Sequence, residues 1–148
     1  MDSSPEVVAR RRALEREAPF VPRGVWRRTT WNDRDVVFLC GTLGVAFDTW
    51  QRRLSLMSAA DALLSQQLGM DAVEREMDRL EGEARAAVEA EGRRLLPRRS
   101  PGYGDLPLGL SREILERLDA TRRIGVSVTD ANLLVPSKSV TAVCEVAD

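Results

Sequence analysis

One segment of this 148-residue chain combines residue types that suit the binding of a small ligand. The run Arg98-Arg-Ser-Pro-Gly-Tyr-Gly-Asp105 offers guanidinium groups, an aromatic hydroxyl and two glycines close together. Arginine binds a carboxylate through a two-pronged fork, and glycine lets a flat ring approach main-chain amides. The segment therefore suits a ligand with a carboxylate and a ring, although the same residues are also typical of a plain turn between two helices.

Residues 70–91, which precede this loop, have the clearest helical pattern in the chain. Apolar residues recur at three- and four-residue steps and make one stripe, formed by Met70, Val73, Met77, Leu80, Ala84, Ala87 and Val88. Glu74, Asp78 and Glu81 lie on an adjoining face, and Gly92 is a typical helix end. We expect a helix with a packed stripe and an acidic row beside it.

Several kinds of site are excluded by composition. The chain has no histidine, which rules out zinc sites of the usual His type, Ser-His and Cys-His nucleophile pairs, and an axial imidazole for a corrin or haem. Cys40 and Cys144 are too few for a metal cluster, and we expect buried thiols rather than a disulfide. Lys138 is the only lysine among 22 basic residues.

Length and charge indicate one cytoplasmic domain. A chain of 148 residues with 43% apolar side chains has the size of a single core. Its formal net charge of −1 gives no reason to expect a nucleic-acid partner. No apolar run is long enough to cross a membrane and no signal-peptide pattern begins the chain, so we expect neither a membrane partner nor export.

The remaining patterns predict an α+β fold. Runs of β-branched and aromatic residues, or their alternation, predict strands at 35–40, 124–128 and 139–146. With the helices between them, these strands favour a small antiparallel or mixed sheet that has helices packed against it on one side, in a single domain.

Local signals add helix boundaries. Residues 1–34 lack a clean period and are expected to be an N-terminal arm, partly helical around 5–17 or flexible, ahead of a domain at 35–148. Ser58 and Asp61 resemble a capping box, and Ser111 is expected to cap a short helix.

Three segments together resemble one known family. The runs Arg98-Arg-Ser-Pro-Gly-Tyr-Gly-Asp-Leu-Pro-Leu108, Ile124-Gly-Val-Ser-Val-Thr-Asp130 and Pro136-Ser-Lys-Ser-Val-Thr-Ala142 resemble, in order and spacing, the reactivation domain of cobalamin-dependent methionine synthase. They are most similar to the small free-standing relatives of that domain. Gly41-Thr-Leu-Gly44 and Ala72–Asp78 also resemble that group, so the resemblance covers residues from about 38 to 146.

The resemblance implies a binding site for S-adenosylmethionine. In the family, the arginine of the Arg-x-x-x-Gly-Tyr motif holds the ligand carboxylate, the loop backbone lies against the adenine, and an acidic residue of the long helix contacts the amino-acid part. The positions that match are Arg98, Ser100, Pro101, Gly102, Tyr103 and Glu74, with Asp78 as a rival to Glu74.

Three further residues keep two interpretations each. Tyr103 either faces the corrin or caps the core with its ring. Lys138 either reaches a corrin amide or phosphate or is a surface turn residue. Thr42 either contacts ligand or satisfies the backbone of its turn.

The implied chemistry is reductive methylation. Cob(II)alamin takes up one electron, and the cob(I)alamin that results accepts the methyl group of S-adenosylmethionine, so the protein has to position reactants rather than supply a base. Because the chain has neither a histidine nor a corrinoid module, the cobalamin would come on a partner protein, either a methionine synthase or another corrinoid-binding protein.

The expected role is therefore that of an accessory protein in methionine biosynthesis. It would be a methyltransferase component for methionine synthase activation rather than a complete enzyme, with turnover by the chain itself left open. The alternative is a non-catalytic partner that docks on a corrinoid protein or completes a split methionine synthase.

Overall fold

Strand β2 (Arg34–Thr42) runs through the middle of the sheet, and its residues 36–42 are all buried. A computed structural model describes residues 4–148 of the chain. β2 pairs antiparallel with β1 (Arg23–Trp31) on one side and with β6 (Ser139–Ala147) on the other, and the short β3 (Arg94–Leu95) pairs with the far edge of β6. The sheet has the order β1-β2-β6-β3 and is antiparallel.

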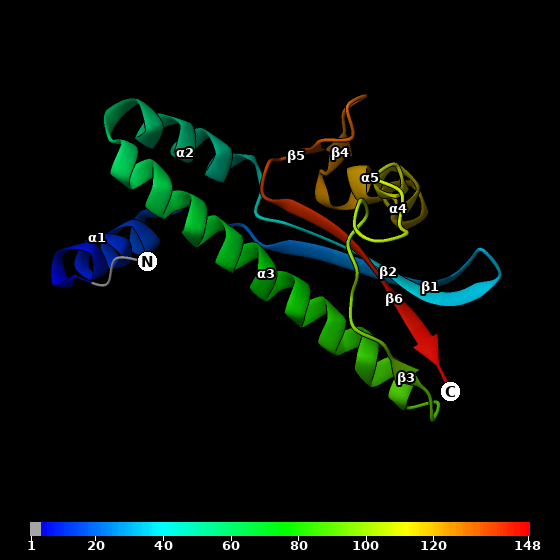
Figure 1. Cartoon of the computed structure of the whole chain (residues 1–148). Helices are drawn as coiled ribbons and strands as arrows, with labels where there is room; N and C mark the ends of the chain where they lie inside the picture. Colours follow the sequence, from blue (N-terminus) through cyan, green and yellow to red (C-terminus); the bar gives the residue numbers. More distant parts are fainter. Residues whose placement is uncertain (1–3) are drawn as a thin grey trace.

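Helices cover both faces of this sheet (Figure 1). In the described part of the chain they are α1 (Pro5–Glu17), α2 (Val45–Met57), α3 (Ala59–Glu89), α4 (Leu110–Leu118) and α5 (Ala120–Ile124). Val37 and Leu39 of β2 pack towards α3, whereas Val36 and Phe38 pack towards α4 and α5. Successive side chains of a strand point to opposite faces, so a strand that is apolar at every position needs a layer on each side. The α+β single domain is confirmed, and the expectation of helices on one side only is wrong.

α2 and α3 form a helical hairpin that extends beyond the sheet, and α1 packs against it (Figure 1). Ser58 caps α3, because its Oγ accepts a hydrogen bond from the Asp61 backbone N at 3.2 Å, as predicted. α1 begins and ends where the sequence indicated, and it attaches through the buried Leu14 and an ion pair of 2.7 Å between Arg10 and Asp61. None of the helices within residues 4–148 is long and apolar enough to cross a membrane.

The predicted stripe of α3 is largely confirmed. Its buried members are Val73, Met77, Leu80, Ala84 and Val88. Met70 is 51% exposed, and Ala87 is exposed as well. Of the residues expected to pack there, those two do not.

β1 is a strand that the sequence analysis missed within the N-terminal arm. Only Val25 of its residues is buried, and its arginines hide the alternation by which half-buried strands are recognised. Asn32 and Asp33 join it to β2 with φ angles of 51° and 62°, the backbone that a two-residue hairpin turn requires. The strands predicted at 35–40 and 139–146 are confirmed as β2 and β6.

Two predictions after residue 110 need correction. The segment 124–128 contributes only the short strand β4 (Ser127–Val128), which pairs with β5 (Leu134–Val135) in a separate two-stranded sheet. Ser111 lies inside α4 instead of capping it, and its Oγ hydrogen-bonds to Thr141 Oγ1 at 2.9 Å in the interior. A buried hydroxyl needs a partner, and β6 supplies it.

A pair of glycines lets α3 come close to the sheet. Gly24 of β1 and Gly41 of β2 are direct partners across the two strands. A Cβ atom on Gly24 would lie 2.5 Å from Glu76 Oε2 and 2.6 Å from Leu80 Cδ1. The space that the missing side chains leave is occupied by Glu76, whose side chain is 6% exposed and is paired with Arg79.

Replacement of Gly24 tests this close packing. We expect Gly24→Ala to lower the free energy of unfolding by about 1–3 kcal/mol, because the added methyl group pushes α3 away from the sheet. Gly82→Ala on the outer side of α3 is the control: no atom lies within 4 Å of its Cβ position, and alanine there should add up to about 1 kcal/mol through helix propensity. Urea unfolding measures both, and equal effects would contradict the packing argument.

Candidate functional site

The loop predicted to bind ligand crosses the edge of the sheet. It leaves β3, passes β6 and enters α4 on the other face (Figure 1). Arg99 fixes the crossing, because its N donates to Val143 O and its O accepts from Val143 N, both at 2.9 Å. Neighbouring residues of an extended segment point in opposite directions, so Arg98 turns to α3 and Arg99 turns to the α4 side.

Three carboxylates of α3 hold the Arg98 guanidinium. Arg98 Nη2 donates to Glu74 Oε2 at 2.6 Å, and Nη1 donates to Asp78 Oδ1 at 2.8 Å and to Glu81 Oε1 at 2.9 Å. The three acids are four and three residues apart, which places them in one row on the helix. We call Arg98, Glu74, Asp78 and Glu81 the Arg98 cluster.

The members of the Arg98 cluster differ in exposure. The side chains of Arg98 and Glu81 are 21% and 14% exposed, whereas those of Glu74 and Asp78 are 47% and 68% exposed. Burial alone would lower the pKa of Arg98, but its hydrogen bonds to the carboxylates outweigh that effect and raise the pKa above the ordinary value. The guanidinium therefore keeps its charge, and two of its partners are open to water.

Residues Ser100 to Tyr103, which follow Arg98 in the chain, form a hydrogen-bonded turn. Gly102 N donates to Leu106 O at 3.0 Å, and Tyr103 N donates to Ser100 O at 3.3 Å. Gly102 has a φ of +90°, which favours glycine, and a Cβ there would lie 3.0 Å from Leu108 Cδ1. Ser100 is half-buried, Pro101 is buried and Gly102 is exposed.

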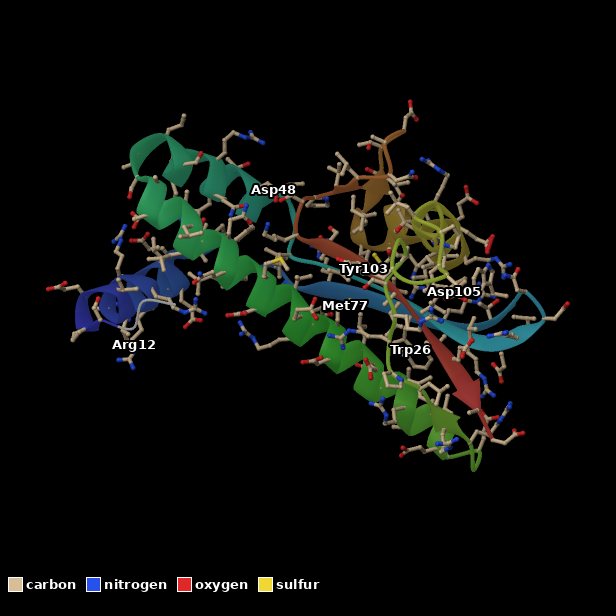
Figure 2. All side chains as sticks on the ribbon, viewed as in Figure 1. Arg12, Trp26, Asp48, Met77, Tyr103 and Asp105 are labelled. Atoms are coloured by element: carbon tan, nitrogen blue, oxygen red, sulfur yellow. The ribbon has the colours of Figure 1, made fainter. Side chains whose placement is uncertain are left out.

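The ring of Tyr103 lies outside the core. Its side chain stands between the ribbons of α3 and the loop that leads to α4, and it is 74% exposed (Figure 2). An exposed aromatic ring with a hydroxyl can stack on a flat ligand or a partner surface. The interpretation that Tyr103 caps the core is therefore wrong.

The other side of the loop lines a hollow of about 260 Å³. Val36, Leu106 and Val143 contribute apolar side chains to it. Two ion pairs lie at this hollow, one between Arg99 and Asp105 and one between Arg34 and Glu145. Asp105, the last residue of the predicted binding segment, thus serves the α4 side and not the Arg98 cluster.

Lys138 lies apart from the Arg98 cluster. Its Nζ donates to Gln66 Oε1 at 2.5 Å, and its Cε lies 3.0 Å from the position of a Cβ on Gly69. Burial lowers the pKa of Lys138, although the charge of Asp48 acts in the opposite direction. Its partner Gln66 precedes Glu74 on α3 by eight residues, a rise of about 12 Å along the helix. Lys138 is a half-buried tether between the turn and α3.

Thr42 satisfies its own turn, as the simpler interpretation predicted. Its Oγ1 accepts from Gly44 N at 3.3 Å and hydrogen-bonds to Ser139 Oγ at 2.8 Å. Both hydroxyl groups are buried, so they join β2 to β6. Thr42 is a structural residue in this arrangement.

The structure brings together the two ends of the predicted site. Arg98 and Glu74, 24 residues apart in the chain, form an ion pair, and Asp78 is bound to the same guanidinium. Sequence reasoning had placed Glu81 in the acidic row without linking it to Arg98. The spacing of the three acids was the signal that could have revealed this contact. Acids three and four residues apart on a helix lie close together, so a cation that binds one of them is near the others.

The arrangement presents one cation, the Arg98 guanidinium, beside the exposed carboxylates of Glu74 and Asp78. No group of three or more Cys, Asp and Glu side chains among residues 4–148 is placed to hold a metal ion. No model of a known protein family matches the chain, and no curated protein matches it.

The two cysteines lie in the interior. Both are free thiols, Cys40 on the α4 side of the sheet and Cys144 on the α3 side, as expected for buried thiols without a disulfide. Burial raises the pKa of both thiols to about 12, and the nearby charge of Glu81 adds to the effect at Cys144. Neither thiol is ionised at neutral pH.

Thiol labelling checks this description. Since the thiolate is the reactive form, Ellman's reagent at pH 8 should leave both cysteines of the folded protein unmodified and should modify both in urea. Above about pH 8.5 the unfolded chain loses thiol protons that the folded chain retains, so the free energy of unfolding should fall as pH rises from there. A Cys40→Ala/Cys144→Ala variant should show a shallower fall, and rapid labelling of the folded protein would contradict the burial of the thiols.

Proposed function

We propose that the chain binds S-adenosylmethionine at the Arg98 cluster and assists a cobalamin-dependent methionine synthase or a related corrinoid methyltransferase. The cobalamin would be supplied by the partner protein, and the bound S-adenosylmethionine would donate its methyl group in the reductive methylation of cob(II)alamin. The observation that carries the proposal is the contact of 2.6 Å between Arg98 and Glu74. It joins two residues, one on the loop and one on α3, to which the resemblance assigns the ligand.

The chemistry of the ligand suits this cluster. The amino-acid part of S-adenosylmethionine has a carboxylate, which needs a cation, and an ammonium group, which needs an anion. Arg98 and Glu74 supply the cation and the anion, and they are paired with each other. The ligand can replace this pair by two new ones, between Arg98 and its carboxylate and between Glu74 and its ammonium group. Glu74 is 47% exposed, so water can solvate its carboxylate when the ligand separates it from Arg98.

The charge of the cluster also favours this ligand. Glu74, Asp78 and Glu81 carry three negative charges, and Arg98 together with Arg85, which is paired with Glu81, carries two positive charges. The balance is one negative charge. S-adenosylmethionine, with an ammonium, a sulfonium and a carboxylate, has one positive charge, so its attraction to this surface should weaken at high salt.

The chain's own contribution would be to hold and orient. Arg98 keeps its charge, and the loop that follows it exposes Gly102 and the ring of Tyr103. Holding two reactants in line supplies a large part of the acceleration of a transfer reaction without any proton transfer. The electron would come from a separate donor.

One observation favours a second candidate function, a non-catalytic partner that docks on a corrinoid protein or completes a split methionine synthase. Both Nη atoms of Arg98 already donate to carboxylates of its own chain. Such a partner would form its complex with the corrinoid protein equally well with and without S-adenosylmethionine, and a pull-down under both conditions separates the two functions.

Isothermal titration with S-adenosylmethionine tests the proposed function. We expect the wild-type protein to bind, and we expect Arg98→Ala to weaken binding by roughly 30-fold or more, because a charge-assisted hydrogen bond contributes about 2–3 kcal/mol.

Arg99→Ala is the matched control for that titration. It removes the neighbouring guanidinium, which faces the other side of the sheet, and should leave the affinity nearly unchanged. Lack of binding by the wild-type protein at millimolar ligand would contradict the proposal, and equal losses in the two variants would place the ligand elsewhere.

A further inference from the structure

We infer that Glu81 is a positioning residue: it holds Arg98 in place while the amino-acid group of the ligand displaces Glu74 and Asp78. This role rests on the proposed function, since it assumes that Arg98 receives the ligand carboxylate. Glu81 itself would touch no ligand atom.

The three carboxylates of the cluster are bound in different ways. Both oxygens of Glu81 are engaged, Oε1 by Arg98 Nη1 at 2.9 Å and Oε2 by Arg85 Nη2 at 2.8 Å. Glu74 and Asp78 each bind Arg98 through one oxygen. Glu81 is therefore clamped between two arginines, whereas the other two acids are held by Arg98 alone in the contacts described.

The three carboxylates also differ in burial, and the acid with two arginine partners is the most buried. Glu81 is 14% exposed, against 47% for Glu74 and 68% for Asp78. A partly buried carboxylate that loses its cation is left as a poorly solvated charge, which costs free energy, whereas water solvates an exposed carboxylate. A ligand that competes for Arg98 should therefore displace the exposed acids and leave Glu81 bound.

The surroundings of Glu81 keep it in place. It lies on the side of α3 that meets β6, near enough to Cys144 for its charge to help raise the pKa of that thiol. Leu80 and Ala84, its neighbours on the helix, are buried against the sheet. The carboxylate thus lies beside the buried face of α3, where it holds Arg98 Nη1.

Two substitutions separate anchoring from mere charge. Glu81→Gln and Glu83→Gln each remove one negative charge from α3. Glu81 accepts a hydrogen bond from Arg98 Nη1, whereas Glu83 lies outside the Arg98 cluster and pairs with Arg79 and Trp26. Two measurements apply to both variants: the ¹⁵N relaxation of Arg98 Nε in the ligand-free protein, and isothermal titration with S-adenosylmethionine.

We expect Glu81→Gln to make the Arg98 side chain mobile and to weaken S-adenosylmethionine binding roughly tenfold, the loss of one charge-assisted hydrogen bond. Glu83→Gln should leave Arg98 ordered and change the affinity by less than about threefold, because it breaks an exposed pair with Arg79 outside the cluster. Arg85→Ala, which frees the other oxygen of Glu81, should loosen Arg98 in the same direction and serves if Glu81→Gln does not fold.

Each contrary result has a separate meaning. An Arg98 side chain as rigid in Glu81→Gln and Arg85→Ala as in the wild type would overturn the positioning role, whatever the ligand does. Equal losses of affinity in Glu81→Gln and Glu83→Gln would also overturn it, since charge alone would then explain both. A third outcome is that Arg98 is loosened in the two variants as expected but the wild-type protein binds no S-adenosylmethionine. This outcome would overturn the proposed function and with it the role of Glu81 in ligand binding.

Discussion

Burial of β2 on both faces is the constraint from which the arrangement of the molecule follows. Its side chains from Val36 to Cys40 are apolar and fully buried, so each face of the sheet has to be covered. The chain meets this requirement with α3 on one face and with α4 and α5 on the other, and it has to cross the sheet edge between them. The loop with Arg98 and Arg99 is that crossing. Arg98, the arginine predicted to bind ligand, faces α3 because it lies where the chain leaves the α3 layer.

The crossing also explains why neighbouring residues have unlike surroundings. The two hydrogen bonds between Arg99 and Val143 hold the backbone as a short extension of the sheet. Arg98 then meets three carboxylates, whereas Arg99 meets one exposed aspartate beside a small hollow. A displacement of one residue in this segment would exchange the two environments, so the bridge to β6 determines which arginine belongs to the cluster.

The sequence predicted those parts of the fold whose signals are local. The stripe of α3 and the strands β2 and β6 follow from periodicity and apolar runs, and the Ser58 cap follows from a three-residue spacing. β1 was missed because its stability comes from pairing with β2, while its own residues are mostly arginine, threonine and tryptophan. The second helical layer was missed because helices at 110–124 do not reveal which face they cover.

The same distinction holds for the candidate site. The resemblance named Arg98 and Glu74 residue by residue, and the structure makes them neighbours. Glu81 was visible only as a member of an acidic row, because its contact with Arg98 depends on how the crossing loop returns to α3. A contact between a helix and a loop 17 residues further on is decided by the packing of both on the sheet, and no local pattern records it.

The chemistry available at this surface is limited to holding charge and shape. The chain has no histidine, both thiols keep their protons at neutral pH, and Arg98 keeps its positive charge. A surface of this kind is poorly suited to general acid–base catalysis by imidazole or thiol and well suited to a reaction whose reactivity resides in its reactants. Methyl transfer from a sulfonium to a reduced corrinoid is such a reaction. Under the proposed function, the pH dependence of that transfer should therefore originate in the corrinoid partner and the electron donor, because Arg98 keeps its positive charge across the neutral range.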